Sequence, residues 1–459
     1  MRLTSLLLLL FLTLGCLVQA EPGPSAPRAL GLSEAVDLAL QQNLKTRISR
    51  EKIREAEGRI EQSYASLYPQ FRFVTSQASR TVNLAAQGLS GGFLPIPLLV
   101  GPFYSFDSRV QLAYNLLDPA AAWRRKAADV ERLMAGVEDE YARQSVLTVT
   151  CLDYIRWVGA LQAQKAALAD QRVAEQLVKL ARDQFEVGIS AKVDVIRAES
   201  QLSDKSLRTA QAAEQVDNSQ IELARFIGLP LPSRLDPADP LLGQSSPLPA
   251  LDQVLTMAWE RRLDLALAQR TSQRLELQAS AIKAGSSPTL SLGADYGLAG
   301  NTPVARSTSV YNVGLTLAIP LFDGGLNDGK VEEINSQLRQ AQAQAKDLEI
   351  QVEQEVRNAL RKISLAQQQR QTAGSGRELA EADLRISIDR YQAGLATSVE
   401  TVQAQAQLTR AQEAEVQAQV QYNLSLVQLA QATGNPELLY QLYSLKPPKG
   451  ADPSTRRTP

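Results

Sequence analysis

Hydrophobic residues along this chain follow two spacings, and the changes between them divide the chain into elements. Over 32–68 and 251–287 the apolar positions recur every three to four residues, which predicts an amphipathic helix in each range. Pro69 and Pro288 follow directly. Because proline disfavours the helical conformation in the residue before it, both helices are expected to end there.

After each proline the apolar spacing changes to two. Apolar side chains alternate with polar ones along 106–116 and 311–319, which predicts strands with one apolar face. Shorter alternating stretches precede them, so β-hairpins are expected over 70–117 and 289–321. A hairpin alone is not stable in water, so these strands need a further partner.

A very long helical pattern follows the first β-hairpin. Asp118 and Pro119 form an N-cap and first-turn pair typical of a helix start. No convincing breaker occurs before Gly188, so one helix is expected over 119–187. At about 1.5 Å per residue its length is on the order of 100 Å. Ordinary globular helices have about 10–14 residues.

The same order returns in the second half of the chain. Asp323 begins a second long helix, expected over 324–393, and Gly394 follows it. Return helices are expected over 192–227 and 398–433. Within the long helices a coiled-coil seam is expected at apolar positions spaced four, three and four apart. These positions are Leu147, Cys151, Tyr154 and Val158, and Val352, Val356, Ala359 and Ile363.

The two halves are copies of one plan, because landmark residues keep their order and a nearly constant separation in sequence. These landmarks are Ala39 and Ala258, Pro69 and Pro288, Asp118 and Asp323, Gly188 and Gly394, and Gly228 and Gly434. The separation shortens once, between the proline and the aspartate, so the first copy has the longer loop there. We infer a duplicated order of helix, β-hairpin, long helix and return helix, in a fold that is mainly α with a small β part.

The chain is therefore divided into a leader, two structural repeats, a connector and a tail. The expected ranges are 1–20 for a signal peptide, 21–228 for the first repeat, 229–250 for an irregular connector rich in Pro and Ser, 251–434 for the second repeat, and 435–459 for a tail that is disordered toward its end.

The leader is typical of an export signal. Its apolar run, Leu6–Leu14, is too short to span a bilayer, and Val18–Ala20 forms a small-x-small cleavage site. As an alternative, Thr13–Cys16 resembles a bacterial lipobox, which would make Cys16 a lipidated N-terminus. Either processing route places the mature chain outside the cytoplasm.

Composition argues against catalysis. The chain has 459 residues, a net charge of −1, two cysteines and no histidine. Histidine is the commonest general base and metal ligand, and a near-neutral chain without a basic stripe is not typical of nucleic-acid binding. No nucleophile or phosphate-loop motif occurs. We therefore expect no enzymatic activity, no cofactor, no metal and no nucleic-acid partner.

Four short apolar strands per chain cannot close a membrane barrel, since the smallest have about 8 strands. Open strand edges do not occur in lipid, so other copies of the chain must complete the sheet. Here the duplicated order, together with Ile319–Gly325 (Ile-Pro-Leu-Phe-Asp-Gly-Gly), resembles the TolC outer-membrane efflux family over about 32–443. The first copy, at Tyr114–Ala120, keeps the aspartate and loses the rest of this motif.

The resemblance implies a homotrimer with a 12-stranded β-barrel in outer-membrane lipid, continued by a long α-helical barrel that crosses the periplasm. It also implies a passive exit duct for drug efflux or type I secretion. Its partners would be a periplasmic adaptor (membrane fusion protein) and an inner-membrane pump of the RND or ABC type. The alternative is a secreted structural coiled-coil protein, against which the two matching amphipathic β-hairpins argue.

The same resemblance implies that the turns at Gly188 and Gly394 are periplasmic tips that contact the adaptor and close the duct. The plainer interpretation is that these glycines only supply left-handed turns. In the family, an aspartate and a tyrosine at the tips bond to each other, and these correspond to Asp194 and Tyr391. The family's arginine partner falls at Ala396.

Other tip residues carry further expectations. Arg390, beside the tyrosine, is a candidate substitute for the missing arginine. The family's acidic pore ring corresponds to Glu400 and Gln403, so at most one acidic ring remains; otherwise Glu400 is an ordinary solvated residue. At the opposite end, the Pro-rich apolar loop 89–103 either forms a lid over the barrel mouth or is a variable surface loop.

Overall fold

The computed structural model describes residues 28–87, 97, 99–188, 190–231, 234–239, 250–303, 307–436, 438–439 and 443. The expected signal peptide with Cys16, most of the loop 89–103 and the end of the tail lie outside the described residues. The described residues form two compact units. Unit 2 comprises Lys45–Arg143 and Trp259–Gln354, and unit 1 comprises the described residues before, between and after these ranges. Both repeats contribute to both units.

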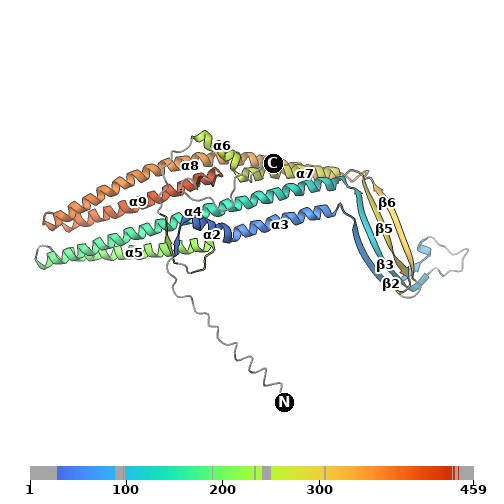
Figure 1. Cartoon of the computed structure of the whole chain (residues 1–459), viewed down its shortest axis with the longest axis horizontal. Helices are drawn as coiled ribbons and strands as arrows, with labels where there is room; N and C mark the ends of the chain where they lie inside the picture. The colour runs from blue at the N-terminus through green and yellow to red at the C-terminus, as the bar shows by residue number, and fades with distance from the viewer. Residues whose placement is uncertain are drawn as a thin grey trace, which may run out of the picture. The chain divides into compact units, whose positions relative to one another are not determined.

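Unit 2 contains a four-stranded antiparallel sheet in the order β2-β3-β5-β6 (Figure 1). The strands are β2 (Gln70–Asn83), β3 (Leu99–Leu117), β5 (Thr289–Gly300) and β6 (Ser307–Ala318). The two β-hairpins of the repeats therefore lie side by side, joined through β3 and β5. Within the described residues, β2 and β6 each keep one edge without a strand partner.

One face of this sheet is apolar across all four strands. Phe73 lies opposite Val110, Val110 opposite Tyr296, and Tyr296 opposite Tyr311, so these four side chains form one row on one face. Their exposed fractions are 67%, 47%, 66% and 79%, although they are large and apolar. The alternation along the sequence is therefore present as one continuous face that no described residue of this chain covers.

The opposite face is polar. Arg109 pairs with Asp107 at 2.6 Å and with Asp295 on the neighbouring strand at 2.9 Å. Gln111 lies opposite Asp295 in the same register. This face therefore has the chemistry of a surface that meets water.

The helices before the strands differ from the expectation. Instead of one helix over 32–68, the structure has α2 (Leu32–Gln42) and α3 (Leu44–Ala65), and instead of one helix over 251–287 it has α6 (Leu251–Arg261) and α7 (Leu263–Ala284). The breaks fall at Asn43 and Arg262, which occupy corresponding positions of the two repeats and have extended backbones. At the first break, Asn43 donates a hydrogen bond to the Phe226 carbonyl at 2.8 Å.

Two long helices leave the sheet. Helix α4 (Pro119–Glu186) is capped by Asp118, whose carboxylate accepts a hydrogen bond from the Ala121 amide at 3.0 Å. Helix α8 (Leu326–Gln392) begins two residues later than expected, because Gly324 and Gly325 both have positive φ angles and lie outside the helix. No helix in the part of the chain that the structure describes combines the length and apolarity needed to cross a bilayer.

Return helices follow, α5 (Lys192–Ile227) after α4 and α9 (Ser398–Ala432) after α8. We call α4 with α5 the first helical hairpin and α8 with α9 the second. All eight expected seam positions are buried, which confirms the predicted spacing.

The core of unit 1 contains elements that the sequence did not predict. Strand β1 (Arg28–Leu30) pairs in parallel with β4 (Leu235–Pro237), which lies in the connector expected to be irregular. Tyr154 donates a hydrogen bond to the Leu30 carbonyl at 3.1 Å and packs edge-on against Trp157. Leu439, assigned to the tail, is 1% exposed and belongs to this core.

Candidate functional site

The two turns between long and return helices lie in unit 1 and share one geometry. Gly188 and Gly394 have φ angles of 80° and 70°, in the left-handed region that favours glycine. A Cβ at either position would not be crowded, since no heavy atom beyond the adjacent residues lies within 4 Å of where it would stand. The glycines are therefore required by the backbone, and not by the space around them.

Polar contacts join the turns of the two repeats. Gln184, near the end of α4, donates a hydrogen bond from Nε2 to the Tyr391 carbonyl at 3.2 Å. Ser398, the first residue of α9, donates from its hydroxyl to Asp194 near the start of α5. The second carboxylate oxygen of Asp194 accepts the Ala191 amide at 3.2 Å, which caps α5. Asp194 thus holds its own helix and the second hairpin together.

The bond between Asp194 and Tyr391 that the resemblance implies is not present. The two residues line one cavity of about 430 Å³, together with Ala396. Tyr391 is 7% exposed, and its buried hydroxyl has no hydrogen-bond partner among the described residues. Burial raises the pKa of Tyr391, the Asp194 carboxylate raises it further, and the Ser190 hydroxyl opposes this rise. Ser398 takes the place at Asp194 that was expected for the tyrosine.

The remaining predicted site residues lie on the exposed side of the turns. Arg390 pairs with Glu400 at 3.5 Å, and both side chains are about half exposed. The expected substitution of Arg390 for the missing arginine at Asp194 is therefore wrong, because Arg390 faces Glu400 and Asp194 pairs with Arg197 at 3.5 Å. Gln403 is exposed.

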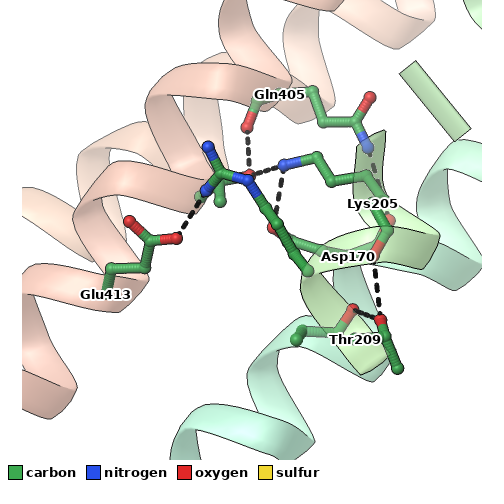
Figure 2. A network of polar contacts seen from close by, with 8 residues as sticks. Asp170, Lys205, Thr209, Gln405 and Glu413 are labelled. Carbon is green, nitrogen blue, oxygen red and sulfur yellow. Dashed lines mark hydrogen bonds and ion pairs between the residues drawn. The ribbon is translucent and has the colours of Figure 1, made fainter. Parts of the chain in front are cut away.

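A second polar site, deeper among the helices of unit 1, was missed by the sequence analysis (Figure 2). The Lys205 ammonium lies 3.2 Å from the Asp170 carboxylate and donates to the Thr409 hydroxyl. Thr409 in turn donates to Asp170 at 2.5 Å. We call Asp170, Lys205 and Thr409 the buried polar cluster. A signal existed, because Asp170 precedes the buried residues Ala174 and Leu177 at seam spacing, which puts a carboxylate on an apolar face.

Neither site resembles a catalytic or metal centre. Among the described residues, no group of three or more Cys, Asp and Glu side chains could hold a metal ion. In both sites polar contacts join a helix of the first repeat to a helix of the second.

Comparison with known proteins identifies the family. A profile of the family described as "Outer membrane efflux protein" matches residues 35–229 and 254–435, one match in each repeat. The chain is 26% identical over 325 residues to Protein CyaE of Bordetella pertussis, which covers 68% of this chain and 65% of that protein. It is 22% identical over 346 residues to Outer membrane protein TolC of Escherichia coli, which covers 72% of this chain and 69% of that protein.

Solved structures share the fold. The outer membrane protein VceC of Vibrio cholerae superimposes with a TM-score of 0.75 at 19% identity, over 88% of this chain and 96% of VceC. The expected class, mainly α with a small β part, is confirmed. Since the family profile matches most of both repeats, this chain belongs to the outer membrane efflux protein family.

Proposed function

We propose that this chain is the outer-membrane exit channel of a tripartite efflux or type I secretion system. The observation that carries the proposal is the sheet of unit 2, with its exposed apolar face, its polar face around Arg109 and its two free edges. In lipid every backbone group must be hydrogen-bonded within the protein. Such a sheet fits lipid on one face and a water-filled pore on the other, once its edges are paired.

Other copies of the chain can pair those edges. The strands alternate in direction, so β2 and β6 run antiparallel to each other. The β6 edge of one copy can therefore pair with the β2 edge of the next without breaking the alternation. Three copies give 12 strands, within the range known for membrane barrels. The strand count is therefore compatible with the homotrimer that the family resemblance implies.

The long helices suit the periplasmic part of the channel. In this proposal α4 and α8 continue the barrel as a helical barrel, and the turns at Gly188 and Gly394 contact a periplasmic adaptor of the membrane fusion class. An inner-membrane pump of the RND or ABC type supplies energy and cargo. The chain itself catalyses no reaction, and the same kind of duct suits either small-molecule efflux or protein secretion. Names of relatives, which include "Outer membrane protein TolC", support this location.

The gate is proposed at the same turns. The Ser398–Asp194 and Gln184–Tyr391 contacts tie the second helical hairpin to the first. Releasing them would let the hairpins part. Glu400, held by Arg390, would form the one acidic ring of the trimer, where three like charges attract cations, and Gln403 would contribute none.

Single-channel conductance in a planar bilayer tests the proposal, with the trimer purified from outer membranes in mild detergent. The wild type is expected to show small, discrete openings, and Asp194→Ala/Ser398→Ala is expected to show larger ones. The control is Arg182→Ala/Glu199→Ala, which removes an exposed 2.6 Å pair within the first hairpin. A folded oligomer without conductance would contradict the channel. Equal openings in wild type and variant would contradict only the gate.

A further inference from the structure

The buried polar cluster joins three helices from two repeats. Asp170 lies on α4 and Lys205 on α5, both in the first hairpin, and Thr409 lies on α9 in the second. The side chains of Lys205 and Asp170 are 6% and 7% exposed. Gln405 adds a hydrogen bond to the Asp170 carbonyl at 3.4 Å, as Figure 2 shows. The buried ion pair Lys205–Asp170 of the first hairpin thus has its hydrogen-bonding partner Thr409 on the second hairpin.

Stability alone does not account for this cluster. Removing two opposite charges from water costs about as much as their attraction returns, so well-packed apolar residues serve equally well for holding helices together. What the charges add is dependence on position. A shift of α9 by one residue would carry the Thr409 hydroxyl away from both charged groups, and a buried charge that loses a hydrogen bond is strongly disfavoured. The cluster therefore favours one register of α9.

The surroundings leave room for water beside the cluster. A cavity of about 400 Å³ is lined by the cluster together with Gln412 and Glu413. Its lining includes several charged and amide side chains, and it is large enough for water, which could hydrate Lys205 and Asp170 after α9 has moved. Hydration would offset part of the loss, so the contact can be released and formed again.

The contacts of α9 with the first hairpin follow one helical face. Ser398, Gln405, Thr409 and Glu413 are spaced seven, four and four residues apart, and each bonds to the first hairpin. Of the ion pairs along this line, Arg208–Glu413 is about half exposed, whereas Lys205–Asp170 is buried. The cluster is thus the position where movement of α9 has the largest electrostatic consequence.

We propose that the buried polar cluster is a second closure point of the channel. It holds α9 in register against α4 and α5, one level deeper than the turns, and it must separate before the second hairpin can move outward. The proposal rests on the channel function proposed above. It concerns residues that carry none of the tip contacts.

The test uses Asp170→Asn/Lys205→Met, which removes both charges and leaves neither partner alone. A second variant, Thr409→Val, keeps the charges and removes only the hydroxyl from α9. The matched control is Arg208→Met/Glu413→Gln, which removes an exposed ion pair between α5 and α9. Two quantities are measured on detergent-purified trimers: amide hydrogen exchange of residues 398–413, and the frequency of openings in planar bilayers.

We expect exchange in 398–413 to become about tenfold faster in both cluster variants, because α9 opens locally more often. Openings should become several-fold more frequent, and the control should change far less than either cluster variant, because its ion pair is exposed. Unchanged exchange in both cluster variants, or an equal rise in the control, would overturn the proposal. If the wild type does not conduct, the channel function fails, whereas the exchange rates still decide whether the cluster holds α9.

Discussion

The first and second helical hairpins have almost the same dimensions and different support. Their long helices have 68 and 67 residues, and their return helices 36 and 35. In α4, buried residues begin at Ala120 and continue along the helix, whereas in α8 the first buried residue is Val352. Duplication thus preserved the lengths, and the surfaces diverged. Residues 326–351 of α8 thus include no buried side chain, which fits a surface that another copy completes.

The polar contacts of the two hairpins also differ. At the positions that correspond to Asp170 and Lys205, the second hairpin has Gly376 and Ala411. The charged pair therefore belongs to the first hairpin, and the second supplies uncharged partners, the Thr409 hydroxyl and the Gln405 amide. We interpret the first hairpin as the fixed element and the second as the element that moves against it.

The largest effect on the free energy of unfolding is expected when only one charge of the buried pair in the first hairpin is removed. Lys205→Met leaves the Asp170 carboxylate buried without its cation, which should lower the free energy of unfolding by about 3–5 kcal/mol. Arg208→Met, at the exposed pair with Glu413, should cost at most about 1 kcal/mol. Denaturation in detergent, followed by circular dichroism, measures both. Equal losses would mean that burial of Lys205 has no energetic consequence and that the two hairpins are alike.

The junctions between strand and long helix offer a second comparison. Leu321 and Phe322 are 92% and 91% exposed, whereas the corresponding Leu116 and Leu117 are 45% and 48% exposed. Leu321 and Phe322 follow the end of the edge strand β6, while Leu117 pairs with Leu290 of the neighbouring strand. The second-repeat junction therefore suits contact with the next copy.

Phe322→Ser is expected to weaken the trimer and leave the subunit folded. Burial of a phenylalanine side chain stabilises by about 1.5–3 kcal/mol, and the closed ring loses this at every interface. Leu117→Ser, the matched control, should destabilise the sheet of one subunit more than the assembly. Sedimentation in detergent reports the trimer fraction. An unchanged trimer fraction for Phe322→Ser would show that this side chain is not at an interface.

Local signals explain which features could be predicted from the sequence. Asp118 and Asp323 cap helices through their own neighbouring amides, and Gly188 and Gly394 have left-handed backbones. Such features are encoded within a few residues. The period of the apolar positions likewise located the sheet and the seam of the long helices.

Features that depend on distant residues could not be predicted. The break at Asn43 has no proline or glycine to mark it, and it is stabilised by the Phe226 carbonyl on α5. The Ser398–Asp194 contact joins residues 204 positions apart. Asp194 and Tyr391 line one cavity, but Asp194 bonds to Ser398, because a motif fixes residue types and not the rotamers that surrounding helices impose.

Replacing the helix-capping residues Asp118 and Asp323 should lower the free energy of unfolding by nearly equal, smaller amounts. Asp323 accepts hydrogen bonds from the Gly325 and Asn327 amides at 3.0 and 2.9 Å, and Asp118 accepts one from Ala121 at 3.0 Å. Replacing either aspartate by alanine should cost about 1 kcal/mol in unfolding free energy. Replacement by asparagine, which still accepts, should cost less. A loss at only one aspartate would show that the capping function survived in only one repeat.

The smallest effect is expected at Tyr391. The corresponding residue of the first repeat is Phe185, so Tyr391→Phe makes the two turns alike. Because the Tyr391 hydroxyl is buried without a partner among the described residues, its removal should leave the unfolding free energy unchanged or raise it by up to about 1 kcal/mol.

The stability of Tyr391→Phe and of the wild type should also differ in how it changes with pH. Burial raises the pKa of Tyr391 above its ordinary value of 10.0, so the folded state holds the phenol proton more tightly than the unfolded state. This contribution to stability is complete below pH 10 and is lost as the pH rises through the folded-state pKa. The variant should therefore lose less stability than the wild type in alkaline buffer. Denaturation midpoints at pH 8 and above pH 10 measure the difference. A variant that is clearly less stable than the wild type at pH 8 would indicate that the hydroxyl does bond to Asp194, and the turns of the two hairpins would then differ in a contact that matters.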